Sequence, residues 1–123
     1  MEWDLSYQPS EEIIYIRTRG TLEINAATQM RNEGAKLIKR HDCKRILLDH
    51  TLLDKNALTT METFDLPKIY DALGISRAIK MALVVTPNMK TKLKFYETVC
   101  RNNGYSVMLF LDRESALEWL KKI

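Results

Sequence analysis

The stretch Lys44-Arg45-Ile46-Leu47-Leu48-Asp49 decides how the rest of the sequence is interpreted. Two cations lead into three large aliphatic residues, and a carboxylate ends the run. An apolar run this short, bounded by polar residues, is typical of a strand buried at the centre of a parallel sheet. Because binding sites in open α/β sheets lie beyond the carboxyl ends of the strands, function is first sought in the segment 49–60.

Two strands are expected before this central one. Apolar and polar side chains alternate over residues 1–8, which indicates a strand with one buried face. A run rich in isoleucine over 12–19 predicts a second strand, which Gly20 ends. The short polar link between them favours an antiparallel pair.

Helices are expected where apolar residues recur at helical spacing, over 25–40, 60–73, 88–103 and 112–123. The residues best suited to cap them are Asn25, Thr59 (in the capping box Thr59-Thr60-Met61-Glu62), Asn88 and Asp112. Pro67 lies inside the second of these helices. Either that helix kinks there, or a short turn ends and a new helix starts with Asp65 as its cap.

Two further strands are expected over 79–85 and 105–111, which gives the order ββαβαβαβα. Such alternation predicts an α/β fold: a mostly parallel sheet with helices packed on it and an antiparallel contribution at one edge. The length and the 46% hydrophobic content suit a single domain over 1–123. The net charge of +3 is too small to indicate a nucleic-acid partner.

The sequence also indicates where the protein works. Cys43 and Cys100 have no CxxC spacing and are expected to be reduced core residues. The first residues do not resemble a signal peptide, and no apolar run approaches the ~20 residues that span a bilayer. We therefore expect a cytoplasmic protein without membrane insertion.

No pattern of catalytic or cofactor-binding residues is found. Asp49-His50-Thr51 places a carboxylate, an imidazole and a hydroxyl side by side, but neighbours on a strand end point in alternating directions. His41 and His50 could bind a metal only together with carboxylates such as Asp42 or Asp54, and no ligand spacing supports this. No glycine-rich phosphate loop is present. We expect a protein that is not an enzyme, with no metal and no cofactor.

Several stretches together resemble a known family. They are the strand 45–49, the segment Leu52-Leu53-Asp54 before a capped helix, the turn Gly104-Tyr105, Phe110, and the final segment 112–120, which contains Ala-x-x-Trp-Leu. This pattern resembles the STAS domain, the fold shared by sulfate-transporter tails and anti-sigma-factor antagonists of the SpoIIAA type. The last segment is similar to that of small bacterial SpoIIAA-like proteins, also described as STAS/SEC14-like. The resemblance covers nearly the whole chain and implies a SpoIIAA-like fold.

The resemblance also marks a regulatory position. In anti-sigma-factor antagonists an Asp-Ser-Ser-Gly motif opens the second helix, and a serine in it is phosphorylated. The matching residues here are Asp54-Lys55-Asn56-Ala57, so the phosphoacceptor serine is missing. The nearby threonines are the remaining hydroxyls that a kinase could use. The candidate partner-binding or regulatory loop comprises Asp49, His50, Thr51, Asp54, Lys55, Asn56, Thr59 and Thr60.

A second candidate surface is apolar. The second helix and the residues before it carry more apolar side chains than one buried face requires: Leu52, Leu53, Met61, Phe64, Ile69 and Tyr70. They indicate a partner surface or a ligand cleft, unless a kink at Pro67 places all of them in the core. The resemblance implies a non-enzymatic interaction or regulatory module that binds a protein partner or its own copy. Its SEC14-like side implies the alternative, a carrier or sensor of a small apolar ligand or lipid.

Overall fold

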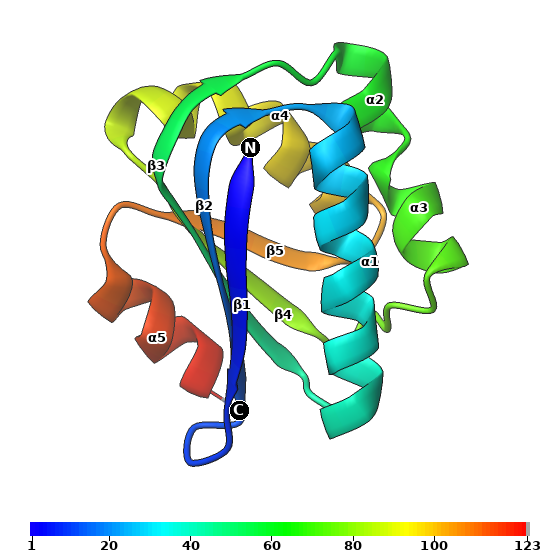
Figure 1. The fold of residues 1–123 in the computed structure, drawn as a ribbon, viewed down its shortest axis with the longest axis vertical. Coiled ribbons are helices and arrows are strands. Elements are labelled where there is room, and N and C mark those ends of the chain that lie inside the picture. Colours follow the sequence, from blue (N-terminus) through cyan, green and yellow to red (C-terminus); the bar gives the residue numbers. More distant parts are fainter. Residues whose placement is uncertain (123) are drawn as a thin grey trace.

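The computed structural model describes residues 1–122, which form a five-stranded sheet and five helices (Figure 1). The elements are β1 (Glu2–Gln8), β2 (Ile13–Leu22), α1 (Ile24–His41), β3 (Arg45–Asn56), α2 (Thr60–Phe64), α3 (Leu66–Ala72), β4 (Lys80–Val84), α4 (Pro87–Asn102), β5 (Ser106–Phe110) and α5 (Arg113–Lys121). The strands lie side by side in sequence order; β1 is antiparallel to β2, and the rest are parallel. The predicted α/β fold class is confirmed.

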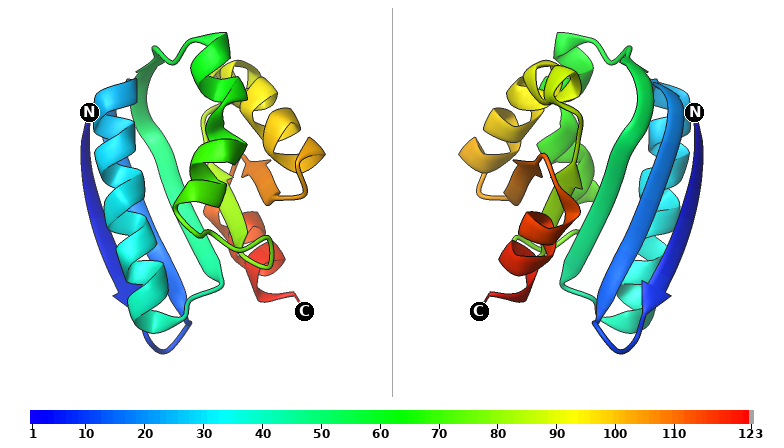
Figure 2. Two further views of the ribbon diagram at one scale, coloured as in Figure 1. Left: turned by 90° about the vertical axis from the view of Figure 1, so that its right-hand side faces the viewer. Right: turned by 90° about the vertical axis from the view of Figure 1, so that its left-hand side faces the viewer.

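The helices cover the two faces of the sheet unequally. Parallel strands that follow one another in one direction, joined by right-handed crossovers, place all connecting helices on the same face. Accordingly α1, α3 and α4 lie on one face, and α5, which follows the last strand, lies on the other (Figure 1). On the shared face, α1 packs on β1 and β2, whereas α4 packs on β3 and β5, with β3 running between the two groups (Figure 2).

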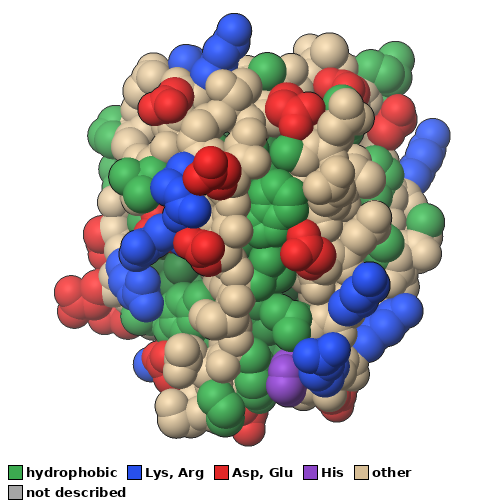
Figure 3. All heavy atoms as spheres, in the orientation of Figure 1, with side chains coloured by type: hydrophobic (Ala, Val, Ile, Leu, Met, Phe, Trp, Pro, Cys, Tyr) green, Lys and Arg blue, Asp and Glu red, His purple; other side chains and the backbone are tan. Residues whose placement is uncertain are grey.

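The central stretch is buried on both faces, as its apolar run predicted. Ile46 and Leu48 point into the large core under α1, α3 and α4. Leu47 points the other way, into a smaller core against Ala116 and Leu120 of α5. On β1 the predicted alternation holds as well, and hydrophobic side chains form a strip between β1 and α1 on the face shown in Figure 3.

The strand β3 is longer than its apolar run indicates. The sequence predicts an end at Asp49, but β3 continues to Asn56. Because β2 also continues past Gly20, it supplies hydrogen-bonding partners for this second half, such as Gly20 opposite Leu53 and Leu22 opposite Asn56. The segment 49–60 is therefore mostly strand and only partly loop.

Two of the predicted helix caps are corrected. The cap of α1 is Glu23 and not Asn25, because the Glu23 carboxylate accepts hydrogen bonds from the amides of Asn25 and Ala26. The cap of α4 is Thr86 and not Asn88, because the helix starts at Pro87 and the Thr86 hydroxyl accepts from the Met89 amide. The Asp112 cap and the Thr59–Glu62 capping box are confirmed.

The second predicted helix is two helices. α2 ends at Phe64 and α3 begins at Leu66, with Pro67 in its first turn. Amides in the first turn of a helix have no partner within the helix, so a proline there breaks no hydrogen bond. The alternative with a new helix at Asp65 is the observed one, although the Asp65 side chain makes no capping hydrogen bond.

A buried polar pair joins β2 to β3 where their register shifts. The ladder is irregular between Arg17 and Arg19. At this point the Thr18 hydroxyl lies 2.6 Å from His50 Nδ1 and donates toward the Asp49 carbonyl oxygen at 3.3 Å. Thr18 and His50 are both buried. Burial lowers the pKa of His50 to about 4, against the opposing effect of the Asp49 carboxylate.

This burial makes the stability of the fold depend on pH. Between the unfolded pKa of 6.5 and the folded value of about 4, the unfolded chain binds a proton at His50 that the native state does not. The free energy of unfolding therefore decreases as the pH is lowered, by about 2 kcal/mol from about pH 7 to about pH 5. Urea unfolding at both pH values measures this loss, and His50→Gln is expected to remove most of it. An equal loss in the wild type and the variant would contradict the assignment.

Candidate functional site

The residues at the middle of β3 point to opposite sides of the sheet. Asp49 Oδ1 accepts hydrogen bonds from the Thr51 amide (3.0 Å) and hydroxyl (2.6 Å), and Arg17 Nε lies 3.6 Å from Oδ2. Burial acts to raise the pKa of Asp49, but the bonds from Thr51 and the charge of Arg17 hold it below its usual value. His50 points into the core instead, so these three neighbours do not converge on one reaction centre.

The predicted regulatory loop divides in the structure. Asp54 and Lys55 are exposed on the last part of β3. The Asn56 side chain accepts a hydrogen bond from the Leu58 amide at 3.1 Å and so shapes the turn after the strand. Thr59 is engaged in the capping box, where its hydroxyl accepts from the Glu62 amide at 3.0 Å.

Three of these loop residues meet a helix that the sequence did not connect with them. Asn56, Thr59 and Thr60 line a hollow of about 270 Å³ together with Lys92 and Phe95 of α4. Phe95 is exposed. The sequence reading missed Lys92 and Phe95 because they come from a distant segment, and only the packing of α2 beside α4 brings them here.

The apolar candidates also divide. Leu52, Met61 and Phe64 are 51%, 66% and 57% exposed, whereas Leu53 and Tyr70 are buried and Ile69 is half-buried. Among the helical candidates, the break at Asp65 separates the exposed residues from the others, because α3 packs against the core and α2 does not bury its Met61 and Phe64 side chains. The excess of apolar residues over one face is therefore an exposed feature of α2 and, separately, of Leu52 in the second half of β3.

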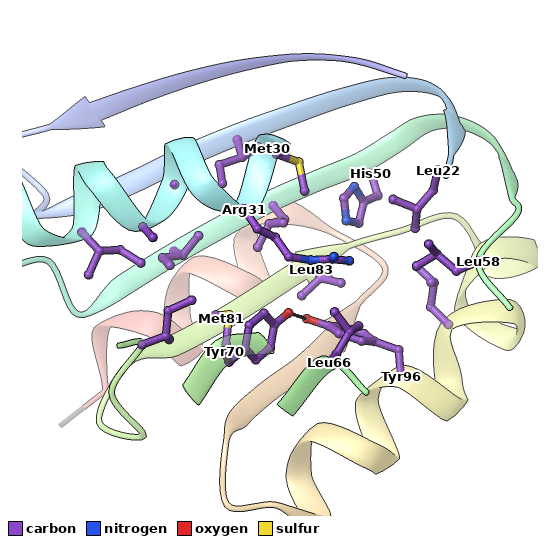
Figure 4. Close-up of a pocket in the computed structure, with 18 residues that line it drawn as sticks. Leu22, Met30, Arg31, His50, Leu58, Leu66, Tyr70, Met81, Leu83 and Tyr96 are labelled. Carbon is purple, nitrogen blue, oxygen red and sulfur yellow. Dashed lines mark hydrogen bonds between the residues drawn. The ribbon is translucent and has the colours of Figure 1, made fainter. Parts of the chain in front are cut away.

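A cavity lies inside the main core between α1 and α3, above β3 and β4 (Figure 4). The space open to the centre of a water molecule is about 70 Å³. Its lining is apolar except for Arg31, His50, Tyr70 and Tyr96. Of the residues singled out from the sequence, His50 and Tyr70 reach this cavity.

The polar groups of the cavity are unequally satisfied. The hydroxyls of Tyr70 and Tyr96 lie 2.7 Å apart and share a hydrogen bond. Burial raises the pKa of Tyr70 to about 12, so this hydroxyl keeps its proton. Arg31 differs, because its Nη1 atom is buried and has no hydrogen-bond partner among the residues described.

The sequence reading missed Arg31, although a signal was present. Arg31 stands four residues after Ala27 and three before Gly34, two residues of the apolar face of α1. This spacing places it on that face. A cation within an apolar stripe is the pattern that identifies it.

The cysteines, possible metal ligands and helix lengths of residues 1–122 give no further candidate site. Cys43 and Cys100 are free thiols in the core, as predicted. Within residues 1–122, His, Cys, Asp and Glu side chains form no group of three or more that could hold a metal ion. No helix in that range is long and apolar enough to cross a membrane.

Comparison with known proteins shows the fold and goes no further. No family model and no curated protein matches the sequence. Among solved structures, the anti-sigma factor antagonist SpoIIAA in its unphosphorylated form has 19% identity and a TM-score of 0.61, with 99% of this chain and 100% of that chain covered. An anti-sigma factor antagonist from Mycobacterium paratuberculosis has 8% identity and a TM-score of 0.66, with 98% and 96% covered.

A third structure matches equally well. It is a protein of the DUF3478 family with a SpoIIAA-like fold from Shewanella loihica PV-4, with 18% identity, a TM-score of 0.62, and 96% and 93% of the two chains covered. Identities this low establish a shared fold and no shared activity. The chain has the SpoIIAA-like fold that its sequence predicted.

Proposed function

We propose that this chain is a non-enzymatic interaction module that binds a protein partner, or its own copy, through the α2 surface. This surface comprises Met61 and Phe64 of α2 and the hollow lined by Thr59, Thr60, Lys92 and Phe95. The exposure of Met61 and Phe64 carries the proposal, because large apolar side chains gathered at one place on a protein surface mark interaction sites. The anti-sigma factor antagonists of the same fold support it as analogues.

The chemistry of the α2 surface indicates what it binds. Phe64 and Phe95 offer aromatic area, which contributes strongly to binding when a partner covers it. Lys92 adds a positive charge beside the hollow. A partner segment with an apolar anchor and an acidic residue next to it fits this arrangement best.

Met61→Asp tests the proposal without harming the helix. Met61 is the second residue of α2, where a carboxylate is favoured by the helix dipole, so folding is expected to be preserved. Burying the new charge in an interface is unfavourable, and we expect complex formation to weaken by about 10-fold or more. Leu111→Asp is the matched control, because Leu111 is also half-exposed but lies beyond β5.

Two measurements read the result. Sedimentation velocity reports self-association, and affinity purification from the producing cells with quantitative mass spectrometry reports other partners. The proposal requires a complex that Met61→Asp weakens and Leu111→Asp keeps. Equal association of both variants with the wild-type partners, or no complex at all, would contradict it.

A second candidate function rests on a different observation. We infer that the chain is alternatively a carrier or sensor of a small apolar ligand, because a largely apolar cavity lies in the core between α1 and α3. Well-packed interiors rarely leave such space, and apolar cavities in proteins bind small apolar molecules. The two functions share a segment, since α3 lines the cavity and α2 precedes it directly.

Native mass spectrometry of the freshly purified protein tests this second function. A mass above a whole number of chains, lost on denaturation, is the expected result. Clean multiples of the chain mass, with no uptake of octanol or octanoate on incubation, would sink the idea. An added phosphate that survives denaturation would instead identify a modified hydroxyl, for which the exposed Thr51 and Thr60 are the first positions to examine.

A further inference from the structure

The side chain of Arg31 reaches from α1 into the middle of the cavity. Figure 4 shows its guanidinium between His50 on one side and the hydroxyl pair of Tyr70 and Tyr96 on the other. None of the 18 lining residues is an aspartate or glutamate, and Arg31 forms no ion pair within the described chain. Its Nη1 atom is buried and makes no hydrogen bond.

This arrangement works against the stability of the fold. A buried donor without a partner is unfavourable, and a charged one more so, because burial removes the water that would have solvated it. A neutral residue such as leucine would fill the same position on the apolar face of α1 at no such cost. The Nη1 atom of Arg31 is therefore free to take a partner that the described part of the chain does not supply.

The charge of the cavity defines that partner. Arg31 is the only Lys or Arg among the lining residues, and burial and the nearby charge of Arg31 lower the pKa of His50 and keep its ring neutral. A single negative charge balances the site, whereas a doubly charged phosphate would leave one charge uncompensated in an apolar surrounding. A carboxylate also matches the planar fork of a guanidinium with two parallel hydrogen bonds.

The tyrosine pair adds a second donor. Only one proton lies between the two hydroxyls, so the hydroxyl that accepts that bond still has its own proton to donate. Burial keeps both phenols protonated by raising their pKa values. The remaining walls are aliphatic side chains from both helices and the sheet, such as Ile16, Met30, Leu66, Leu83 and Leu93.

We propose that the cavity binds a small monocarboxylate with an apolar body, its carboxylate paired with Arg31 and its body against the aliphatic walls. This rests on the carrier or sensor function and specifies its ligand class. Free carboxylic acids with short or medium aliphatic chains have the required single charge and apolar surface. An alcohol or an amine of the same length has the apolar surface without the matching charge.

Titration calorimetry with three probes of equal chain length tests the proposal. Octanoate, octanol and octylammonium are titrated into the wild type, Arg31→Gln and Lys36→Gln. Lys36 is the matched control, because it is an exposed cation on the same helix and its loss changes the net charge equally. Circular dichroism verifies that each variant is folded.

The expected pattern is selective for charge and for position. Octanoate binds the wild type and Lys36→Gln with the same affinity and binds Arg31→Gln about 10- to 100-fold more weakly, the range for a lost charge-assisted hydrogen bond. In the wild type, octanoate binds more tightly than octanol and octylammonium. This second comparison needs no substitution, so it decides the question even if Arg31→Gln does not fold.

Two results overturn the proposal in distinguishable ways. Equal affinities for octanoate and octanol, unchanged by Arg31→Gln, would leave an apolar ligand cavity in place and remove the role of Arg31. No binding of any probe to the wild type would remove both the proposed ligand and the carrier or sensor function, while the α2 surface would remain untouched.

Discussion

The fold depends on β3 being covered on both faces and paired along both edges. Its run of aliphatic residues is long enough to serve two cores at once, because alternate side chains point to opposite sides of the sheet. Ile46 and Leu48 hold the large core, and Leu47 anchors α5 on the other side. The elements next to it depend on this strand directly: β2 and β4 pair with it, α4 packs on one of its faces and α5 on the other.

The same constraint creates the cavity. The connecting helices share one face of the sheet, and α1 packs over β1 and β2 while α4 packs over β3 and β5. Short α2 and α3 connect β3 to β4 without a long helix that could fill the middle of that face. Small residues on α1 facing the middle, Gly34 and Ala35, leave further room there. The cavity is thus a result of the topology and of the shortness of α3.

Much of this could be predicted from local sequence. The apolar run, the alternation in β1 and the capping box at Thr59 each act over a few residues, and each prediction was confirmed. The end of β3 was wrong because it is set by pairing with β2, which lies far away in the chain. The predicted caps Asn25 and Asn88 were each wrong by two residues, since several neighbouring polar side chains compete for the same free amides and Glu23 and Thr86 bind them. Lys92 and Phe95 join the site only through tertiary packing.

The sequence prediction missed Arg31 for a different reason. At the wrongly predicted caps, the structure contains no conflict, because a neighbouring side chain accepts hydrogen bonds from the free amides. Arg31 was overlooked although its spacing placed it on the apolar face of α1, where local and global preferences conflict. At most positions of a protein, the local preference of a residue agrees with its place in the global fold. The exceptions concentrate at functional sites, where stability is given up for binding or chemistry. A buried guanidinium nitrogen without a partner is such an exception, and it is the observation on which the proposal of a ligand in this cavity rests.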